Sequence, residues 1–186
     1  LIVGGDRGGM KEVVSAGQAL ASEGHTVDWR VDPHKYARAG LVLDDRQIFY
    51  SRKLPSVKDS LPDLVLVAMS SLATNMQVVA THFAREYKIP VVWVEDFPGA
   101  AHEQVLRGVS PDVLCVIDKG SFEIAQSVRP GLRVEVVGKP SYFEEVGSLL
   151  KRQDDVRREV RDILGLRDLF MVMYSGGQAG ETIEHL

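Results

Sequence analysis

The sequence predicts an α/β protein with a Rossmann-like, doubly wound parallel sheet. Short apolar runs alternate with amphipathic segments along most of the 186 residues, as in sheets whose strands are joined by helices covering both faces. Several runs are continuously apolar, which is typical of strands buried on both faces. Hydrophobic residues make up 45% of the chain, enough to build a sizeable core.

Seven apolar runs are the expected strands. They cover residues 1–3, 26–31, 64–67, 91–94, 113–117, 134–137 and 169–173. Between the first two runs, apolar residues recur at helical spacing from Met10 to Ala21, and Gly24 follows as a natural helix end. The chain therefore opens with a βαβ unit. Further helices are expected over 72–87 and 100–107.

The segment 32–62 fits neither a helical nor a strand period. It is expected to be a solvent-exposed excursion with one edge strand. Basic and aromatic residues are interleaved within it: Lys35, Tyr36, Arg38, Arg46, Phe49, Tyr50, Arg52, Lys53 and Lys58. This composition also permits peripheral contact with a membrane surface or docking of an acceptor.

The first domain is expected to span residues 1–140, because Gly138-Lys139-Pro140 interrupts the pattern there. One or two helices ending at Gly165 follow, with Asp154 as a plausible N-cap between them. The run 169–173 then leads into a glycine-rich loop. A single strand with part of a helix cannot bury its own apolar faces, so residues 141–186 are expected to be linker helices and the start of a truncated second domain.

Composition excludes several classes of protein. Lys and Arg number 22 against 26 Asp and Glu, a net charge of −4, so no nucleic-acid partner is expected. The longest nearly unbroken apolar run, 64–69, is far shorter than the roughly 20 residues of a membrane span. Cys115 is the single cysteine and no His/Cys/Asp cluster has metal-ligand spacing, so a reducing, cytoplasmic setting and no metal site are expected.

Ligands of open α/β sheets bind beyond the carboxyl ends of the strands, where helix N-termini offer free N–H groups. The loop from Gly4 to Gly9 follows the first strand, and its glycines let the backbone approach a ligand closely; the alternative is a tight structural turn. Asp32 would suit the ribose of a dinucleotide, but Asp6 stands where the Gly-x-Gly-x-x-Gly fingerprint needs its second glycine. Ser70 and Ser71 are expected to be ordinary N-caps.

Two carboxylates, Glu95 and Asp96, leave the buried strand 91–94, and His102 lies near the start of the next helix. A partly desolvated carboxylate has a raised pKa suited to general-base work, and His102 would orient or share the proton. The alternative is a capped helix with exposed acids. Since the strands should be parallel, Asp6, Arg7, Glu95, Asp96 and His102 are expected to line one cleft.

A second glycine-rich loop lies near the end of the chain and consists of Ser175, Gly176, Gly177, Gln178, Ala179 and Gly180. Such a turn between a strand and a helix is a good anion cradle. It lacks the Gly-Lys-Ser/Thr ending of a P-loop, so triphosphate hydrolysis is not indicated.

Taken together, the order of five motifs resembles glycosyltransferases of the two-domain GT-B architecture, nearest to the bacterial lipid II N-acetylglucosaminyltransferase group. The motifs are residues 4–9, 62–66, 89–96, 136–140 and 175–180. The resemblance implies an N-terminal domain that holds the acceptor and a C-terminal domain that holds a nucleotide-diphosphate sugar. Two residues depart from the family: Met10 stands where a histidine is usual, and Lys139 replaces an asparagine.

The resulting hypothesis is an inverting sugar transferase without a tightly bound cofactor. Its donor would be a uridine diphosphate sugar, and the hypothesis allows a lipid-linked acceptor. The catalytic candidates are Asp96, Glu95, His102 and Asp6. The ligand-binding candidates are Gly8, Gly9, Ser175, Gly176, Gly177, Gln178 and Gly180. Two alternatives stay open: a nucleotide-sugar epimerase on the same fold, and a non-catalytic acceptor-binding module that works with a separate donor-binding subunit.

Overall fold

The computed structural model describes residues 1–32, 38–54, 61–69, 75–106 and 108–165. The chain divides into two compact units, Leu1–Glu144 and Glu145–Leu186. The strand expected over 169–173 and the glycine-rich loop 175–180 lie outside the described residues, as do Ser70 and Ser71.

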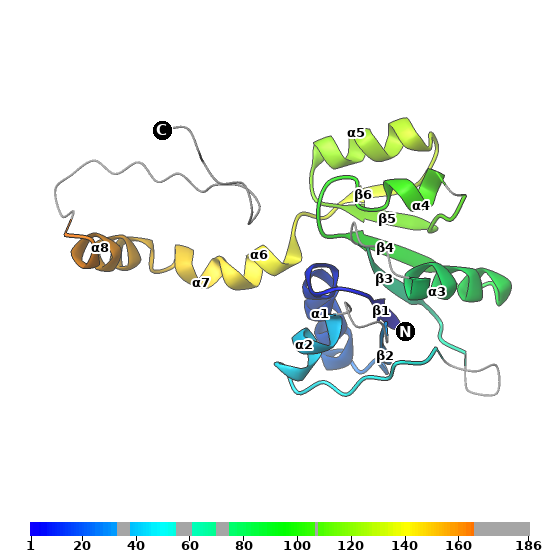
Figure 1. The fold of residues 1–186 in the computed structure, drawn as a ribbon, viewed down its shortest axis with the longest axis horizontal. Coiled ribbons are helices and arrows are strands. Elements are labelled where there is room, and N and C mark those ends of the chain that lie inside the picture. Colours follow the sequence, from blue (N-terminus) through cyan, green and yellow to red (C-terminus); the bar gives the residue numbers. More distant parts are fainter. Residues whose placement is uncertain (33–37, 55–60, 70–74, 107, 166–186) are drawn as a thin grey trace, which may run out of the picture. The chain divides into compact units, whose positions relative to one another are not determined.

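A six-stranded, all-parallel sheet forms the centre of the first unit, which confirms the predicted Rossmann-like α/β fold (Figure 1). Its strands are β1 (Ile2–Gly4), β2 (Trp29–Val31), β3 (Val65–Met69), β4 (Val91–Glu95), β5 (Val113–Val116) and β6 (Val134–Val136), in the spatial order β2-β1-β3-β4-β5-β6. From β1 the chain moves outward to β2 on one side, then returns to β3 on the other side of β1 and continues outward to β6. This reversal creates a topological switch point between β1 and β3.

Five helices connect the described strands: α1 (Arg7–Ser22), α2 (Ala39–Asp44), α3 (Asn75–Glu86), α4 (His102–Leu106) and α5 (Lys119–Val128); α6 (Pro140–Glu145) follows the last of these strands. Aspartates that follow β1 and β5 cap two of them. Asp6 accepts a hydrogen bond from the Gly9 N–H (2.8 Å), and Asp118 accepts one from the Ser121 N–H (2.8 Å). Each cap satisfies one of the free donors at a helix N-terminus.

The second unit contains α7 (Gly147–Leu150) and α8 (Gln153–Ile163) in its described part. The predicted N-cap role of Asp154 is wrong, because Arg152 occupies the N-cap position of α8 and makes no side-chain cap bond. Asp154 lies instead in the first turn, where its negative charge interacts favourably with the helix dipole.

Three helices, α6, α7 and α8, stand where one or two were expected. Two helices of the first unit were absent from the sequence prediction. Within the expected excursion 32–62, α2 buries Val42 and Leu43 and packs against α1. At six residues it is too short to show a helical period. In place of the expected edge strand, the described residues show one isolated parallel bridge, between Arg30 and Ser51. The other missed helix is α5.

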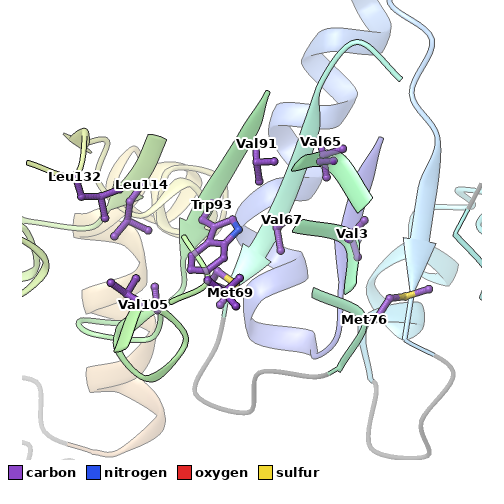
Figure 2. Packing of buried hydrophobic residues seen from close by; sticks show 14 of the residues in the cluster. Val3, Val65, Val67, Met69, Met76, Val91, Trp93, Val105, Leu114 and Leu132 are labelled. Atoms are coloured by element: carbon purple, nitrogen blue, oxygen red, sulfur yellow. The ribbon is translucent and has the colours of Figure 1, made fainter. Parts of the chain in front are cut away.

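Each face of the sheet carries its own apolar cluster, because successive strand residues point to opposite faces. Val67 and Trp93 belong to one cluster, whereas Leu66 and Ala68 pack with Met10 of α1 in the other. Figure 2 shows Trp93 amid the strand valines of the first cluster. Its indole N–H donates to the Thr81 hydroxyl at 3.0 Å, so the buried polar group keeps a partner.

None of the helices in the described part of the chain has the length and apolar character that a membrane-spanning helix needs.

The close packing of α1 on the sheet requires glycine at position 17. A Cβ placed there would overlap the Trp29 ring and lie 2.6 Å from Ile2 Cδ1. We expect Gly17→Ala to lower the free energy of unfolding by about 1–3 kcal/mol, because overpacking outweighs the roughly 1 kcal/mol that alanine adds to helix propensity.

Urea denaturation would measure this change. Gly147→Ala is the matched control, since Gly147 is a helical glycine whose added Cβ would meet open space. A Gly17→Ala variant as stable as the parent would contradict the packing described here.

Candidate functional site

The carboxyl ends of β1, β3 and β4 meet at the switch point of the sheet, where α1 begins (Figure 1). A Cβ on Gly9 would lie 3.3 Å from the backbone carbon of Ala68, so the first turn of α1 packs tightly against the end of β3. Glycine therefore serves close packing here in addition to any ligand contact.

Two carboxylates converge on the glycine loop. A Cβ built on Gly8 would lie 2.5 Å from Asp96 Oδ2 and 3.7 Å from Asp6 Oδ1. Asp6 comes from the end of β1 and Asp96 from the end of β4, so two loops far apart in the sequence bring these groups to one point. Asp6 Oδ1 accepts a hydrogen bond from the Gly9 N–H, whereas Asp96 Oδ1 is buried and has no hydrogen-bond partner among the described residues.

The environment of Asp96 favours its protonated form. Burial is the main cause that raises its pKa, to about 7, and the neighbouring carboxylates of Asp6 and Glu12 raise it further, while Lys139 acts in the opposite direction. A carboxyl group with a pKa near 7 both gives up and accepts a proton readily at neutral pH.

Glu95 points to the opposite face of the sheet, because neighbouring strand residues alternate. It is 3% exposed, and its Oε1 accepts a hydrogen bond from the Ala101 N–H at 2.7 Å. Burial raises its pKa to about 7, with the backbone N–H groups of Gly99 and Ala101 opposing the rise. Glu95 therefore holds the turn that leads into α4, although its Oε2 is buried without a partner.

His102 is exposed and lies with Glu95 at a small, mostly apolar pocket between α4 and α5, lined also by Val105, Leu114 and Ile124. The pair Asp6 and Asp96 is not among the residues that line this pocket. Of the five residues expected in one cleft, the structure thus brings Asp6 and Asp96 together and groups Glu95 with His102. Arg7 is exposed in the first turn of α1.

A buried carboxylate that the sequence analysis missed lies beside this pair. Glu12 on α1 is 2% exposed and accepts hydrogen bonds from the Ser141 N–H (3.0 Å) and hydroxyl (2.7 Å). Lys139 Nζ lies 3.8 Å from the same carboxylate. The sequence signal was available: Glu12 stands between Met10 and Val13, within the buried stripe of α1.

The remaining candidate residues have structural partners. Asp32 is 4% exposed, and its Oδ2 accepts a hydrogen bond from the Met76 N–H (3.3 Å) near the start of α3. The Gly9 N–H is bound to Asp6, so it is already satisfied without a ligand. In the described part of the chain, no group of three or more His, Cys, Asp or Glu side chains is arranged to hold a metal ion.

The fold and this geometry define an α/β protein with a six-stranded parallel sheet and a carboxylate pair at its switch point. Comparison with family models, with curated proteins and with solved structures gives no match to the chain.

The raised pKa of Asp96 predicts how stability depends on pH. A carboxyl group whose pKa is higher in the folded state stabilises the fold at low pH, and this contribution disappears as the pH rises through about 7. Asp96→Asn removes the cost of ionising the group. We therefore expect the variant to have a higher Tm than the parent at pH 8, and the difference to shrink at pH 5.

Thermal unfolding at both pH values would test this. Asp118→Asn is a control for which the opposite change in stability is expected, because hydrogen bonds from Ser121 lower the pKa of Asp118. That variant should lose stability at pH 8. An Asp96→Asn variant with the same pH dependence as the parent would show that the group is not perturbed.

Proposed function

We propose that this chain is the acceptor-binding part of a glycosyltransferase that uses a nucleotide-diphosphate sugar, with Asp96 as the general base. The observation that carries the proposal is the Asp96 carboxyl at the glycine loop of the switch point, with one buried oxygen unpaired and a pKa of about 7. The resemblance of the five sequence motifs to GT-B enzymes supplies the reaction class.

In the proposed reaction an acceptor hydroxyl lies in front of Gly8, between Asp6 and Asp96. Asp96 accepts the hydroxyl proton while the oxygen forms a bond to the anomeric carbon of the donor sugar. The bond from that carbon to the diphosphate breaks, and the nucleoside diphosphate leaves with the electron pair. Inversion at the anomeric carbon follows from this single displacement.

The surroundings of Asp96 suit this role. Lys139 limits the rise of the Asp96 pKa, so that part of the carboxyl population is ionised at neutral pH. Met10, which stands at the histidine position of the resembling family, is fully buried and offers no proton acceptor. The base function therefore falls to a carboxylate in this chain.

The donor diphosphate is assigned to the loop 175–180 and not to the loop after β1. Asp6 and Asp96 both lie against Gly8, and their negative charges would repel a phosphate there. A neutral hydroxyl would not be repelled by these charges, since it can donate a hydrogen bond to a carboxylate. This division agrees with the resemblance, in which the C-terminal domain holds the donor.

In the complete transferase, in which this chain acts together with its donor-binding domain, we expect Asp96→Asn to lower kcat by about 100-fold or more, the usual contribution of a general base, without loss of the fold. Transfer of labelled sugar from uridine diphosphate N-acetylglucosamine to lipid-linked acceptors of a membrane extract would measure it. Glu95→Gln is the matched control, because Glu95 points to the other face and the amide oxygen keeps the Ala101 contact. If Asp96→Asn retains the parental kcat, Asp96 is not the base.

The same assay separates the alternatives. An epimerase would convert the nucleotide sugar with no acceptor present. A non-catalytic acceptor-binding module, which the burial of Met10 also fits, would transfer sugar only after a second, donor-binding chain is added. Transfer by the complete transferase as a single chain, without such a partner, would exclude the module.

A lipid-linked acceptor would require peripheral contact with a membrane, and Phe49 is the best-placed residue for it. Its side chain is 96% exposed, and Arg46, Arg52 and Lys53 nearby in sequence are also exposed. An apolar ring among cations is the usual combination for insertion into an anionic lipid surface.

Phe49→Ser should therefore weaken binding to vesicles that contain phosphatidylglycerol, and added salt should weaken binding of the parent. Vesicle sedimentation would measure both effects. Val79→Ser, which removes an apolar side chain 51% exposed on α3, is the control. Equal sedimentation of Phe49→Ser and the parent would remove Phe49 from the proposed contact.

A further inference from the structure

Two arginine side chains meet at Ser110, at the amino edge of the sheet, away from the candidate site. Arg85 lies in the last turn of α3, and Arg129 is the C-cap residue of α5. Ser110 precedes β5 and is 2% exposed. Two helices that are separate in the chain thus direct their guanidinium groups to one buried residue.

Hydrogen bonds fix both side chains. The Arg85 Nε donates to the Ser110 carbonyl oxygen at 3.1 Å, and its Nη2 donates to the same oxygen at 2.5 Å and to the hydroxyl at 3.3 Å. The Arg129 Nη1 donates to that hydroxyl at 2.6 Å. The two guanidinium groups are therefore close neighbours that share one hydroxyl oxygen.

This closeness places two positive charges side by side without a counter-charge. Among the described residues, neither Arg85 nor Arg129 forms an ion pair with a carboxylate. The carbonyl groups at the ends of α3 and α5 favour each cation individually, but they do not remove the repulsion between the two.

Within the described part of the chain, the anchoring bonds leave specific donors unused. Arg85 binds Ser110 through Nε and Nη2, so its Nη1 group remains available. Arg129 binds through Nη1, so the edge formed by its Nε and Nη2 remains available for a two-point contact. Because Ser110 holds both side chains, little rotamer freedom would be lost when an anion binds.

We propose that Arg85 and Arg129 form a binding site for a phosphate group. A tetrahedral phosphate presents three or more oxygens, so it can offer a separate pair of acceptors to each of two guanidinium groups, whereas a carboxylate has only two oxygens to share between them. The site is independent of the proposed sugar transfer, since it lies at the opposite edge of the sheet and shares no residue with the carboxylate pair.

Titration of inorganic phosphate into the 186-residue chain, followed by the NMR signals of the arginine side-chain Nε–H groups, would test this. We expect saturable shifts of the Arg85 and Arg129 signals, with a dissociation constant of about 1 mM or below. Arg129→Gln should weaken binding about tenfold. Arg133→Gln should leave it unchanged, because Arg133 is an exposed arginine already paired with Glu135.

A second anion and a second Arg129 variant complete the test. Acetate should bind more weakly than phosphate. Arg129→Lys keeps the positive charge but loses the planar guanidinium edge, so it should bind phosphate more weakly than the parent. This variant also replaces Arg129→Gln if the Gln variant fails to fold. Shifts that do not saturate, or equal binding by the parent and the folded Arg129 variants, would overturn the site.

Discussion

The parallel pairing of β1 with two neighbours is the constraint on which the rest of the first unit depends. Its three residues are buried and pair with β2 on one side and β3 on the other. Because the strands of the sheet are parallel, the loops after β1 and β4 emerge at one edge. Asp6 and Asp96 meet there although 90 positions separate them in the sequence.

Successive side chains along β4 point to opposite faces of the sheet, so the adjacent carboxylates Glu95 and Asp96 have different surroundings. Glu95 follows the direction of Trp93 and holds the turn before α4, whereas Asp96 follows Val94 toward α1 and the glycine loop. Both have raised pKa values, mainly because burial penalises the charged form of each carboxyl group. A perturbed pKa is thus not enough to identify the base, and the direction of the side chain separates the structural group from the catalytic candidate.

The sequence was sufficient for the sheet. Continuous apolar runs such as 64–67 and 91–94 predicted buried parallel strands within one or two residues of their ends. The short helices were harder to predict: α2 is formed by its packing against α1, and α5 has a mixed surface with Ser121 as its one buried residue. Short helices of this kind are stabilised mainly by packing against other elements, and the local sequence pattern carries no information about that packing.

The site was predictable only in part. The rule that ligands bind at the carboxyl ends of strands was enough to predict that Asp6 and Asp96 lie close together, but it also placed His102 in the same cleft. Separating these required the facing direction of each side chain. The contact of Glu12 with Ser141 joins residues 129 positions apart, and single-sequence patterns do not reveal contacts at that distance.

The charges at the switch point form one coupled arrangement. Asp6 is stabilised by the Gly9 N–H, and Glu12 by Ser141 and Lys139, so both have partners that compensate the negative charge. Asp96 Oδ1 has no such bond, which leaves this carboxyl group to respond to the field of the others. Because Glu12 lies within 4 Å of Lys139, the turn after β6 is tied electrostatically to the first helix. The ionisation of Asp96 therefore depends on β1, β4 and β6 keeping their places in one sheet, and a change at the turn after β6 would alter the proton affinity of a carboxyl group on a distant loop.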